Sequence, residues 1–222
     1  MQQVDRRALT RCISARKERR FPGMDKIICV GKNYLDHAQE LGDAVPEMPV
    51  LFLKPPSSLF QANQLGAVLE VDLPRGKGAV HYETEIVLRL EQGKITDVTL
   101  GLDLTLRALQ GELKKAGHPW ELAKVFAGSA LVGPWLPIKD FLRYLDTPFS
   151  FFLNGVQRQK ANGHEMRLLP DQILRYAAEW FPLCDGDLVF TGTPRGVGEL
   201  SPGDRGQLNW GTQTLFEVQW RP

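Results

Sequence analysis

The sequence predicts a mixed, β-dominated α+β fold. Its 222 residues include 21 glycines and 15 prolines, an excess over average composition that favours many turns and therefore many short strands. Segments with the period of a strand outnumber those with the period of a helix. The two kinds do not alternate along the chain as a doubly wound sheet would require. The dipeptide Asn154-Gly155, between two strand-like segments, indicates a tight β-hairpin.

The first predicted elements are a strand, a short helix and a second strand. Residues 27–30 are an apolar run that ends at a glycine, as expected for a buried strand. A helix is expected from residue 33 to residue 41. Residues 42–50 are rich in proline and acidic side chains, so we expect a loop there, followed by a strand over residues 50–53.

The middle of the chain reads as two strands and a helix. Residues 81–90 alternate polar and apolar side chains, and they end at a hairpin-like connection over residues 91–94. A further strand runs into residues 101–104. Thr105 is expected to cap a helix that covers about residues 106–116.

Strands dominate the prediction after residue 124. Residues 149–153 and 156–159 flank Asn154-Gly155 as the two strands of its hairpin. Residues 170–180 form an amphipathic pattern with proline in the first turn, which indicates a helix. The remaining strands are expected at residues 187–190, 207–210 and 215–220.

Composition and charge argue against several classes of function. A net charge of +1 provides no global field that would recruit nucleic acid or a membrane surface, and no stretch approaches the 18 apolar residues of a membrane span. Three cysteines without Cys-x-x-Cys spacing indicate free thiols in a reducing compartment, so we expect a cytoplasmic protein. Residues 1–22 contain six arginines and two acidic residues, a pattern that a mitochondrial transit peptide shares. We interpret them as a basic extension of a single catalytic domain over residues 23–222.

Two carboxylates in the segment 81–90 form a candidate ligand site. Glu83 and Glu85 are two residues apart, so on a strand they project from one face with Cα atoms roughly 7 Å apart. Asp103, at the end of the next predicted strand, supplies a third carboxylate. Such an oxygen-only set suits Mg²⁺, Mn²⁺ or Ca²⁺ rather than zinc. The alternative is a half-buried strand whose polar face is simply exposed to water.

Two pairs of side chains with helical spacing are candidates for catalysis and binding. His37 and Glu40 form a minimal general-base pair, because a carboxylate fixes the tautomer of an imidazole and raises its basicity. Arg107 and Gln110 share a helix face beside Asp103, where an arginine would bind a substrate carboxylate in bidentate fashion. The alternatives are a surface pair and a solvated arginine.

Two lysines and one loop complete the candidates. Lys54 and Lys124 each follow apolar residues, so each ammonium either extends to water or points at an anion. Residues 191–198, which include Thr193, contain three glycines and two threonines after a strand. Their N–H groups and hydroxyls could hold a carboxylate or an oxyanion. The arrangement of a Walker lysine is absent, so a nucleotide-binding loop is not expected.

Six short motifs follow one another along the chain in a familiar order. They are Val30-Gly31-Lys32-Asn33-Tyr34, Leu51-Phe52-Leu53-Lys54-Pro55, His81-Tyr82-Glu83-Thr84-Glu85, Leu102-Asp103-Leu104-Thr105, Leu122-Ala123-Lys124 and Thr191-Gly192-Thr193-Pro194-Arg195-Gly196-Val197-Gly198. Together they resemble the fumarylacetoacetate hydrolase family, and most of all its short acylpyruvase-type members. The resemblance covers nearly the whole chain, from about residue 26 to the C-terminus.

The resemblance implies a β-roll like the C-terminal domain of that family, with a few short helices, a dimeric core and a Mg²⁺ or Mn²⁺ site. It also implies a role for each candidate side chain. The metal ligands would be Glu83, Glu85 and Asp103, the water-activating pair His37 and Glu40, the catalytic cation Lys124, and the substrate-binding residues Arg107, Gln110, Thr193 and Lys54.

The activity implied by the resemblance is hydrolysis of a carbon–carbon bond in acylpyruvates or related 2,4-dioxo acids. The products would be pyruvate and a carboxylic acid, formed through a metal-bound enolate with the His37–Glu40 pair activating water. Decarboxylation of oxaloacetate or keto–enol tautomerisation on the same site is the main alternative, and a non-catalytic relative that binds small acids is a third. The expected partners are a small oxo acid and a second copy of the chain, with no nucleic acid and no membrane.

Overall fold

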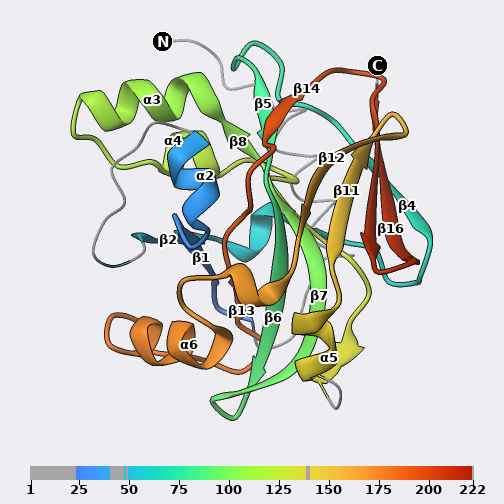
Figure 1. Cartoon of the computed structure of the whole chain (residues 1–222). Coiled ribbons are helices and arrows are strands. Elements are labelled where there is room, and N and C mark those ends of the chain that lie inside the picture. The colour runs from blue at the N-terminus through green and yellow to red at the C-terminus, as the bar shows by residue number, and fades with distance from the viewer. Residues whose placement is uncertain (1–23, 41–47, 49, 139–140, 222) are drawn as a thin grey trace.

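Strands build most of the molecule, and they form three sheets in the part of the chain that the structure describes (Figure 1). The computed structural model describes residues 24–40, 48, 50–138 and 141–221, without the side chains of residues 37–39 and 141–143. The expected β-dominated α+β class is confirmed. The basic extension over residues 1–22 lies outside the described residues, so that prediction is not tested.

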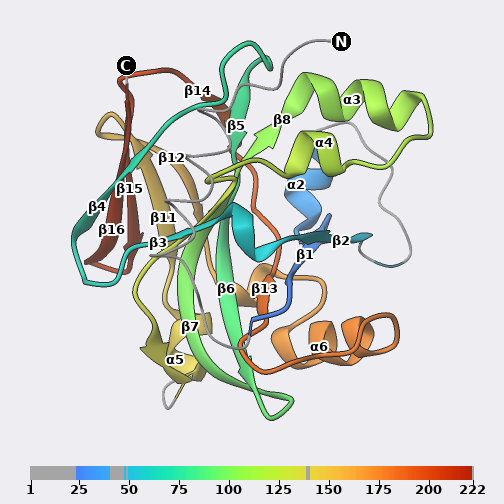
Figure 2. The same ribbon diagram turned by 180° about the vertical axis from the view of Figure 1, so that it is seen from behind.

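The largest sheet has eight strands and holds the centre of the molecule (Figure 2). Its strand order is β2-β1-β13-β6-β7-β9-β3, with β10 paired to β7. Strands β6 and β7 form its long antiparallel hairpin, whereas β1 pairs with β13 in parallel. The strands are β1 (Ile27–Gly31), β2 (Val50–Lys54), β3 (Leu59–Gln61), β6 (Thr84–Glu91), β7 (Lys94–Asp103), β9 (Ala130–Val132), β10 (Leu136–Pro137) and β13 (Leu188–Phe190).

Two smaller sheets complete the roll. The five-stranded sheet has the order β12-β11-β15-β16-β4, and the three-stranded sheet has the order β14-β5-β8. Their strands are β4 (Ala67–Val71), β11 (Phe149–Leu153), β12 (Val156–Ala161), β15 (Arg205–Trp210) and β16 (Gln213–Trp220), and then β5 (Val80–Tyr82), β8 (Thr105–Leu106) and β14 (Gly198–Leu200).

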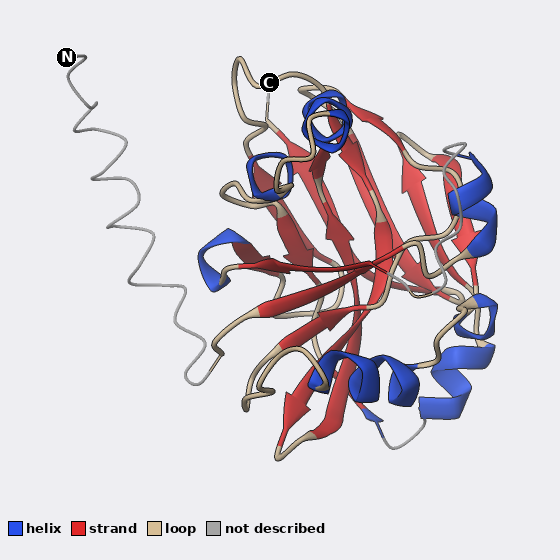
Figure 3. Ribbon diagram, turned by 90° about the vertical axis from the view of Figure 1, so that its left-hand side faces the viewer, coloured by secondary structure: helices blue, strands red, loops and turns tan. Residues whose placement is uncertain are grey.

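The helices are short and lie around the periphery of the strands (Figure 3). In the described residues none of them is long and apolar enough to cross a membrane. Within the described ranges the α-helices are α2 (Leu35–Glu40), α3 (Arg107–Lys115), α4 (Glu121–Lys124), α5 (Phe141–Asp146) and α6 (Pro170–Ala178), and 3-10 turns cover Pro56–Ser58 and Gly163–Glu165.

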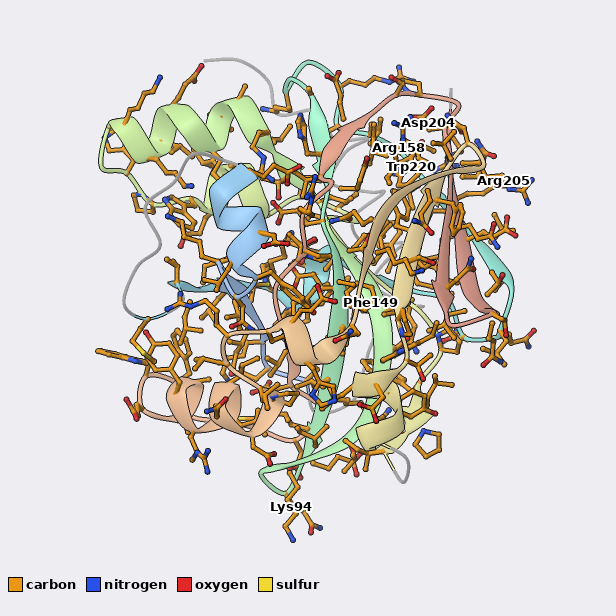
Figure 4. The ribbon with its side chains drawn as sticks, in the orientation of Figure 1. Lys94, Phe149, Arg158, Asp204, Arg205 and Trp220 are labelled. Atoms are coloured by element: carbon orange, nitrogen blue, oxygen red, sulfur yellow. The ribbon has the colours of Figure 1, made fainter. Side chains whose placement is uncertain are left out.

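A shared apolar core joins the sheets. It combines residues of β6 and β7 with aromatic side chains of the five-stranded sheet, among them Phe149 and Trp220, which are labelled in Figure 4. A second cluster, which includes Val87 and Phe190, covers the opposite face of the large sheet. The large sheet is therefore buried on both faces, and the alternative of a water-exposed strand face at residues 81–90 is wrong.

The hairpin predicted at Asn154-Gly155 joins β11 to β12 as expected. Both residues have positive φ, 52° and 78°, as a type I′ turn requires. The connection at residues 91–94 also forms a hairpin, whose tip near Lys94 lies at the far end of the molecule from Arg158, Asp204 and Arg205 (Figure 4).

Other boundaries differ from the prediction. The helix expected over residues 170–180 ends at Ala178, and the one expected from residue 33 begins at Leu35. Thr105 does not cap the helix that follows, because it belongs to β8, where it pairs with His81. No local pattern predicted the short helices α4 and α5, which span only four and six residues.

Candidate metal centre and acid-binding pocket

The segment expected as one strand over residues 81–90 is divided between two sheets at Glu83. Strand β5 ends at Tyr82 in the three-stranded sheet, and β6 begins at Thr84 in the large sheet. The adjacent strand makes the same transition, because β7 ends at Asp103 in the large sheet and the next strand, β8, belongs to the three-stranded sheet. The N–H of Asp103 donates to the carbonyl of Glu83 at 2.9 Å. The junction of the sheets therefore places both carboxylates together.

Glu85 joins these two residues to make a cluster of three carboxylates. Carboxylate oxygens of Glu83, Glu85 and Asp103 all lie within 4.8 Å of one another. The three residues are buried, with relative exposures of 5%, 2% and 1%. Three negative charges so close together and so little hydrated require cations nearby.

Lys124 and Lys54 supply part of that positive charge. The ammonium of Lys124, on α4, donates to Glu83 at 2.8 Å, to Asp103 at 2.7 Å and to the hydroxyl of Thr105 at 2.7 Å. Burial alone would lower the pKa of Lys124, but the carboxylates of Asp103 and Glu83 raise it above its usual value. The two carboxylates therefore favour the charged form of Lys124 in the metal-free structure.

Lys54 lies behind the cluster. Its ammonium is 2.6 Å from the second oxygen of Asp103 and donates to the carbonyls of Ser129 and Leu104 at 2.7 Å and 3.2 Å. It is fully buried and is not among the residues that line the cavity beside the carboxylates. The structure thus gives Lys54 a place from which it supports Asp103.

Glu85 differs from the other two carboxylates. In the described part of the chain, the ion pairs of Lys54, Lys124 and Arg107 are made with Asp103 and Glu83 and none with Glu85. Burial, together with the charges of Asp103 and Glu83, raises the pKa of Glu85 well above its usual range. A bound cation would favour the ionised form of Glu85, which forms no ion pair among the described residues.

The loop over residues 191–198 contacts the protein's own carboxylates. The N–H of Gly192 donates to Glu85 at 2.7 Å, and the N–H of Gly196 lies 3.0 Å and 3.1 Å from the two oxygens of Glu40. Gly192 has φ of 101°, and a Cβ there would lie 2.9 Å from the carbonyl oxygen of Val30. Only glycine fits this turn. Two N–H groups of the loop are thus used by carboxylates of the chain itself, and the expected binding of a ligand by the loop stays a prediction.

Arg107 and Gln110 face the cluster from the start of α3. The guanidinium of Arg107 contacts the carboxylate of Glu83 and also donates to Oε1 of Gln110 at 2.8 Å. The two residues therefore share one helix face beside the carboxylates, as their spacing predicts.

A cavity opens next to the three carboxylates. Phe52 and Trp120, whose ring centroids are 6.2 Å apart, line it together with charged and polar groups. The polar lining includes Arg107, Gln110, Lys124 and Thr193, in addition to the three carboxylates. A small anion with an apolar or planar body fits this combination of cations and aromatic rings.

Of the expected base pair His37 and Glu40, the structure describes only the side chain of Glu40. Glu40 lies near the loop through Gly196, whereas the side chain of His37, one helical turn earlier, is outside the described part of the structure. The expected His37–Glu40 pair is therefore a prediction still.

Sequence reasoning missed Thr105 and Gln159. Thr105 looked like a helix cap, but its hydroxyl binds the Lys124 ammonium. Gln159 stands in the polar run of β12, yet it is 1% exposed and reaches the cavity wall. Nothing in the local sequence marks this glutamine, because its partners lie far away in the chain.

The donor set fits a hard divalent cation. All three candidate ligands are carboxylates, the oxygen ligands that Mg²⁺ and Mn²⁺ prefer, and no thiol or imidazole belongs to the cluster among the described residues. Cys29, a free buried thiol close enough to feel the cluster's charges, has its pKa raised by burial and by Asp103, so it stays protonated and is a poor ligand.

Known proteins resemble this chain over most of its length. A family model of the fumarylacetoacetate (FAA) hydrolase C-terminal domain matches residues 26–215. Oxaloacetate tautomerase YcgM of Escherichia coli is 40% identical over 195 residues, which are 82% of this chain and 86% of that protein. A mitochondrial oxaloacetate tautomerase of Caenorhabditis elegans is 37% identical over 190 residues, covering 81% and 86% of the two chains. The structure of a fumarylpyruvate hydrolase from Pseudomonas aeruginosa, in complex with Mn²⁺ and pyruvate, superposes with a TM-score of 0.80 at 31% identity and covers 89% of this chain and 91% of that one.

Proposed function

Because the chain belongs to the fumarylacetoacetate hydrolase family, we propose that it is a divalent-metal-dependent enzyme that interconverts the keto and enol forms of oxaloacetate. The observation that carries the proposal is the buried cluster of Glu83, Glu85 and Asp103 beside a cavity lined by cations. Two relatives named oxaloacetate tautomerases, at 40% and 37% identity, support this choice of reaction.

Glu83, Glu85 and Asp103 would hold a Mg²⁺ or Mn²⁺ ion in this proposal. Such an ion supplies Lewis acidity, which polarises a keto group and makes the adjacent C–H bond more acidic. The residues of the chain must then bind the acid, hold its reacting carbon in place and move one proton.

Arg107 and Thr193 are the proposed contacts for the substrate carboxylate, and Gln110 keeps the Arg107 guanidinium in place through their hydrogen bond. Phe52 and Trp120 form the wall against which the planar enol would lie. Anchoring the carboxylate at one end places the keto group and its neighbouring methylene next to the carboxylate cluster.

Lys124 would stabilise the negative charge that develops on the keto oxygen as the proton leaves carbon. Its ammonium already donates to Glu83 and Asp103, so it lies where a cation could serve as such a donor. The His37–Glu40 pair is the proposed base, which takes the proton from carbon, and the enol oxygen is protonated in turn.

Hydrolysis of acylpyruvates is the second candidate. It is favoured by the structural similarity to the fumarylpyruvate hydrolase and was the first expectation from the sequence. In that reaction His37 and Glu40 would deprotonate water instead of carbon. The tautomerases take precedence here because their sequences are more similar to this chain.

The experiment compares substrates with the purified protein and Mg²⁺. Enzyme-dependent decay of the ultraviolet absorbance of enol-oxaloacetate, without pyruvate formation, is expected. Release of pyruvate from acetylpyruvate would instead favour hydrolysis, and pyruvate formed from oxaloacetate would indicate decarboxylation. If all three assays match the protein-free controls, the proposed function is wrong.

A second test concerns the base. His37→Ala is expected to reduce turnover strongly while Mg²⁺ still raises the temperature of unfolding, because the substitution leaves all three carboxylates intact.

The homodimer and the cytoplasmic location stay predictions, and light scattering of the purified protein tests the first of them.

A further inference from the structure

Gln159 is a buried polar residue in a largely exposed strand. In β12 its neighbours Arg158 and Lys160 are exposed, whereas Gln159 is 1% exposed. Burying a primary amide is unfavourable unless its donors and acceptor are all used. One contact of Gln159 is with Thr193, which lines the cavity, and another is with Thr84, between two of the clustered carboxylates.

The orientation of the Gln159 amide is fixed by its partners. The N–H of Thr84, between Glu83 and Glu85, donates to Oε1 of Gln159 at 3.0 Å. The Nε2 group therefore lies on the other side, where it donates to Oγ1 of Thr193 at 2.9 Å and to the carbonyl of Pro194 at 2.9 Å. A flipped amide would set donor against donor at Thr84 and acceptor against acceptor at Pro194.

This orientation decides what the hydroxyl of Thr193 can do. Because Oγ1 already accepts a hydrogen bond from Gln159, its own proton must be donated elsewhere. Among the described residues the Thr193 hydroxyl donates to the Pro194 carbonyl over 3.5 Å, a long contact to an oxygen that also accepts from Gln159 at 2.9 Å. Thr193 lines the cavity, so an anion bound there would be a stronger acceptor for its proton than this long contact.

We propose that Gln159 is a positioning residue that commits the Thr193 hydroxyl to donate a hydrogen bond to the carboxylate of the bound acid. The inference rests on the proposed function, since it requires an oxo acid in this cavity. Gln159 itself does not touch the substrate. It acts through Thr193, and it also ties the strand of the carboxylates to the loop that carries Thr193.

A double-mutant cycle with Mg²⁺ present tests the proposal. Gln159→Met is introduced into the wild type and into Thr193→Val, and the KM for oxaloacetate, kcat and the calorimetric Kd for oxalate are measured. In the wild-type background we expect about a tenfold rise in KM and in the oxalate Kd with a smaller change in kcat, the loss of one hydrogen bond to a charged group. In the Thr193→Val background the same substitution should change both by less than about twofold.

Two further variants sharpen the result. Thr193→Ser keeps a hydroxyl, so Gln159→Met should again weaken binding about tenfold in that background. Gln157→Met makes the same chemical change at an exposed position of the same strand and should leave both constants unchanged. If Gln159→Met does not fold, Gln159→Glu replaces it, because a carboxylate still accepts from Thr84 but offers Thr193 no amide donor.

An equal loss in the wild-type and Thr193→Val backgrounds would overturn the inference, because Gln159 would then act through Thr84 or through the fold. The proposed function would survive that result. Absence of both oxaloacetate turnover and oxalate binding in the wild type would overturn the two together.

Discussion

The N–H of Gly192 donates a hydrogen bond of 2.7 Å to Glu85, the one carboxylate of the cluster that forms no ion pair within the described chain. Burial and the charges of the two neighbouring carboxylates raise the pKa of Glu85, and this one hydrogen bond lowers it by less. Glu85 is therefore the residue whose behaviour depends most on a bound cation.

Removing the charge of Glu85 should separate stability from metal binding. In the wild type, Mg²⁺ at about a hundredfold excess over its Kd should add about 2.7 kcal/mol to the free energy of unfolding, which raises the melting temperature by about 5 to 10 °C. Glu85→Gln should melt above the wild type in EDTA and respond little to Mg²⁺. Scanning fluorimetry measures both, with the exposed Glu70→Gln as control. An equal Mg²⁺ response in Glu85→Gln would exclude Glu85 as a ligand.

Glu85 should also make the stability of the metal-free protein depend on pH. The native pKa of Glu85 is raised above its ordinary value of 4.5, so the folded state holds this proton more tightly than the unfolded state. Its contribution to stability is complete below about pH 4.5 and is lost as the pH rises through the native pKa. The melting temperature of Glu85→Gln minus that of the wild type should therefore widen from about pH 4.5 upward. A constant difference would contradict the assignment.

Lys124 should be needed for turnover but not for metal binding. Lys124→Met removes the cation that donates to Glu83 and Asp103, and kcat/KM should fall about 10² to 10³-fold, as when a donor to developing negative charge is lost. Mg²⁺ should still raise the melting temperature, because the carboxylates remain. Lys160→Met, at an exposed site of β12, is the matched control. Full activity of Lys124→Met would remove its proposed role.

Substitution of Asp187, which does not line the cavity, should lower the free energy of unfolding. Its fully buried carboxylate accepts hydrogen bonds from the N–H groups of Lys26 and Cys184 and from the Lys26 ammonium at 2.8 Å. Asp187→Ala leaves the two N–H groups without this acceptor and the Lys26 ammonium with the exposed Asp25 alone, and should cost about 3 to 5 kcal/mol in urea denaturation. Asp187→Asn keeps an acceptor oxygen and should lose less. Equal losses would mean that the charge of Asp187 matters more than its hydrogen bonds.

Local sequence signals predicted the parts of the fold that depend on local structure. Asn154-Gly155 defined its hairpin because a type I′ turn needs positive φ at both residues. Glu83 and Glu85 could be paired because a strand repeats every two residues, although the break between two sheets at Glu83 left no mark in that pattern.

The rest depended on contacts between distant segments. Lys54 and Lys124 follow similar apolar residues, yet one is buried behind Asp103 and the other lines the cavity. Thr105 reads as a helix cap until its strand partner is known. Gln159 meets Thr84 across 75 positions of sequence, a distance at which periodicity carries no information.

Glu83 and Asp103 mark the places where two adjacent stretches of chain leave one sheet for another. An ion bound by these two residues would link the three-stranded sheet to the large sheet. Removal of the ion by a chelator should therefore speed amide hydrogen exchange in β5 and β8 more than in the middle of β6 and β7. The small sheet would then open locally before the large sheet unfolds.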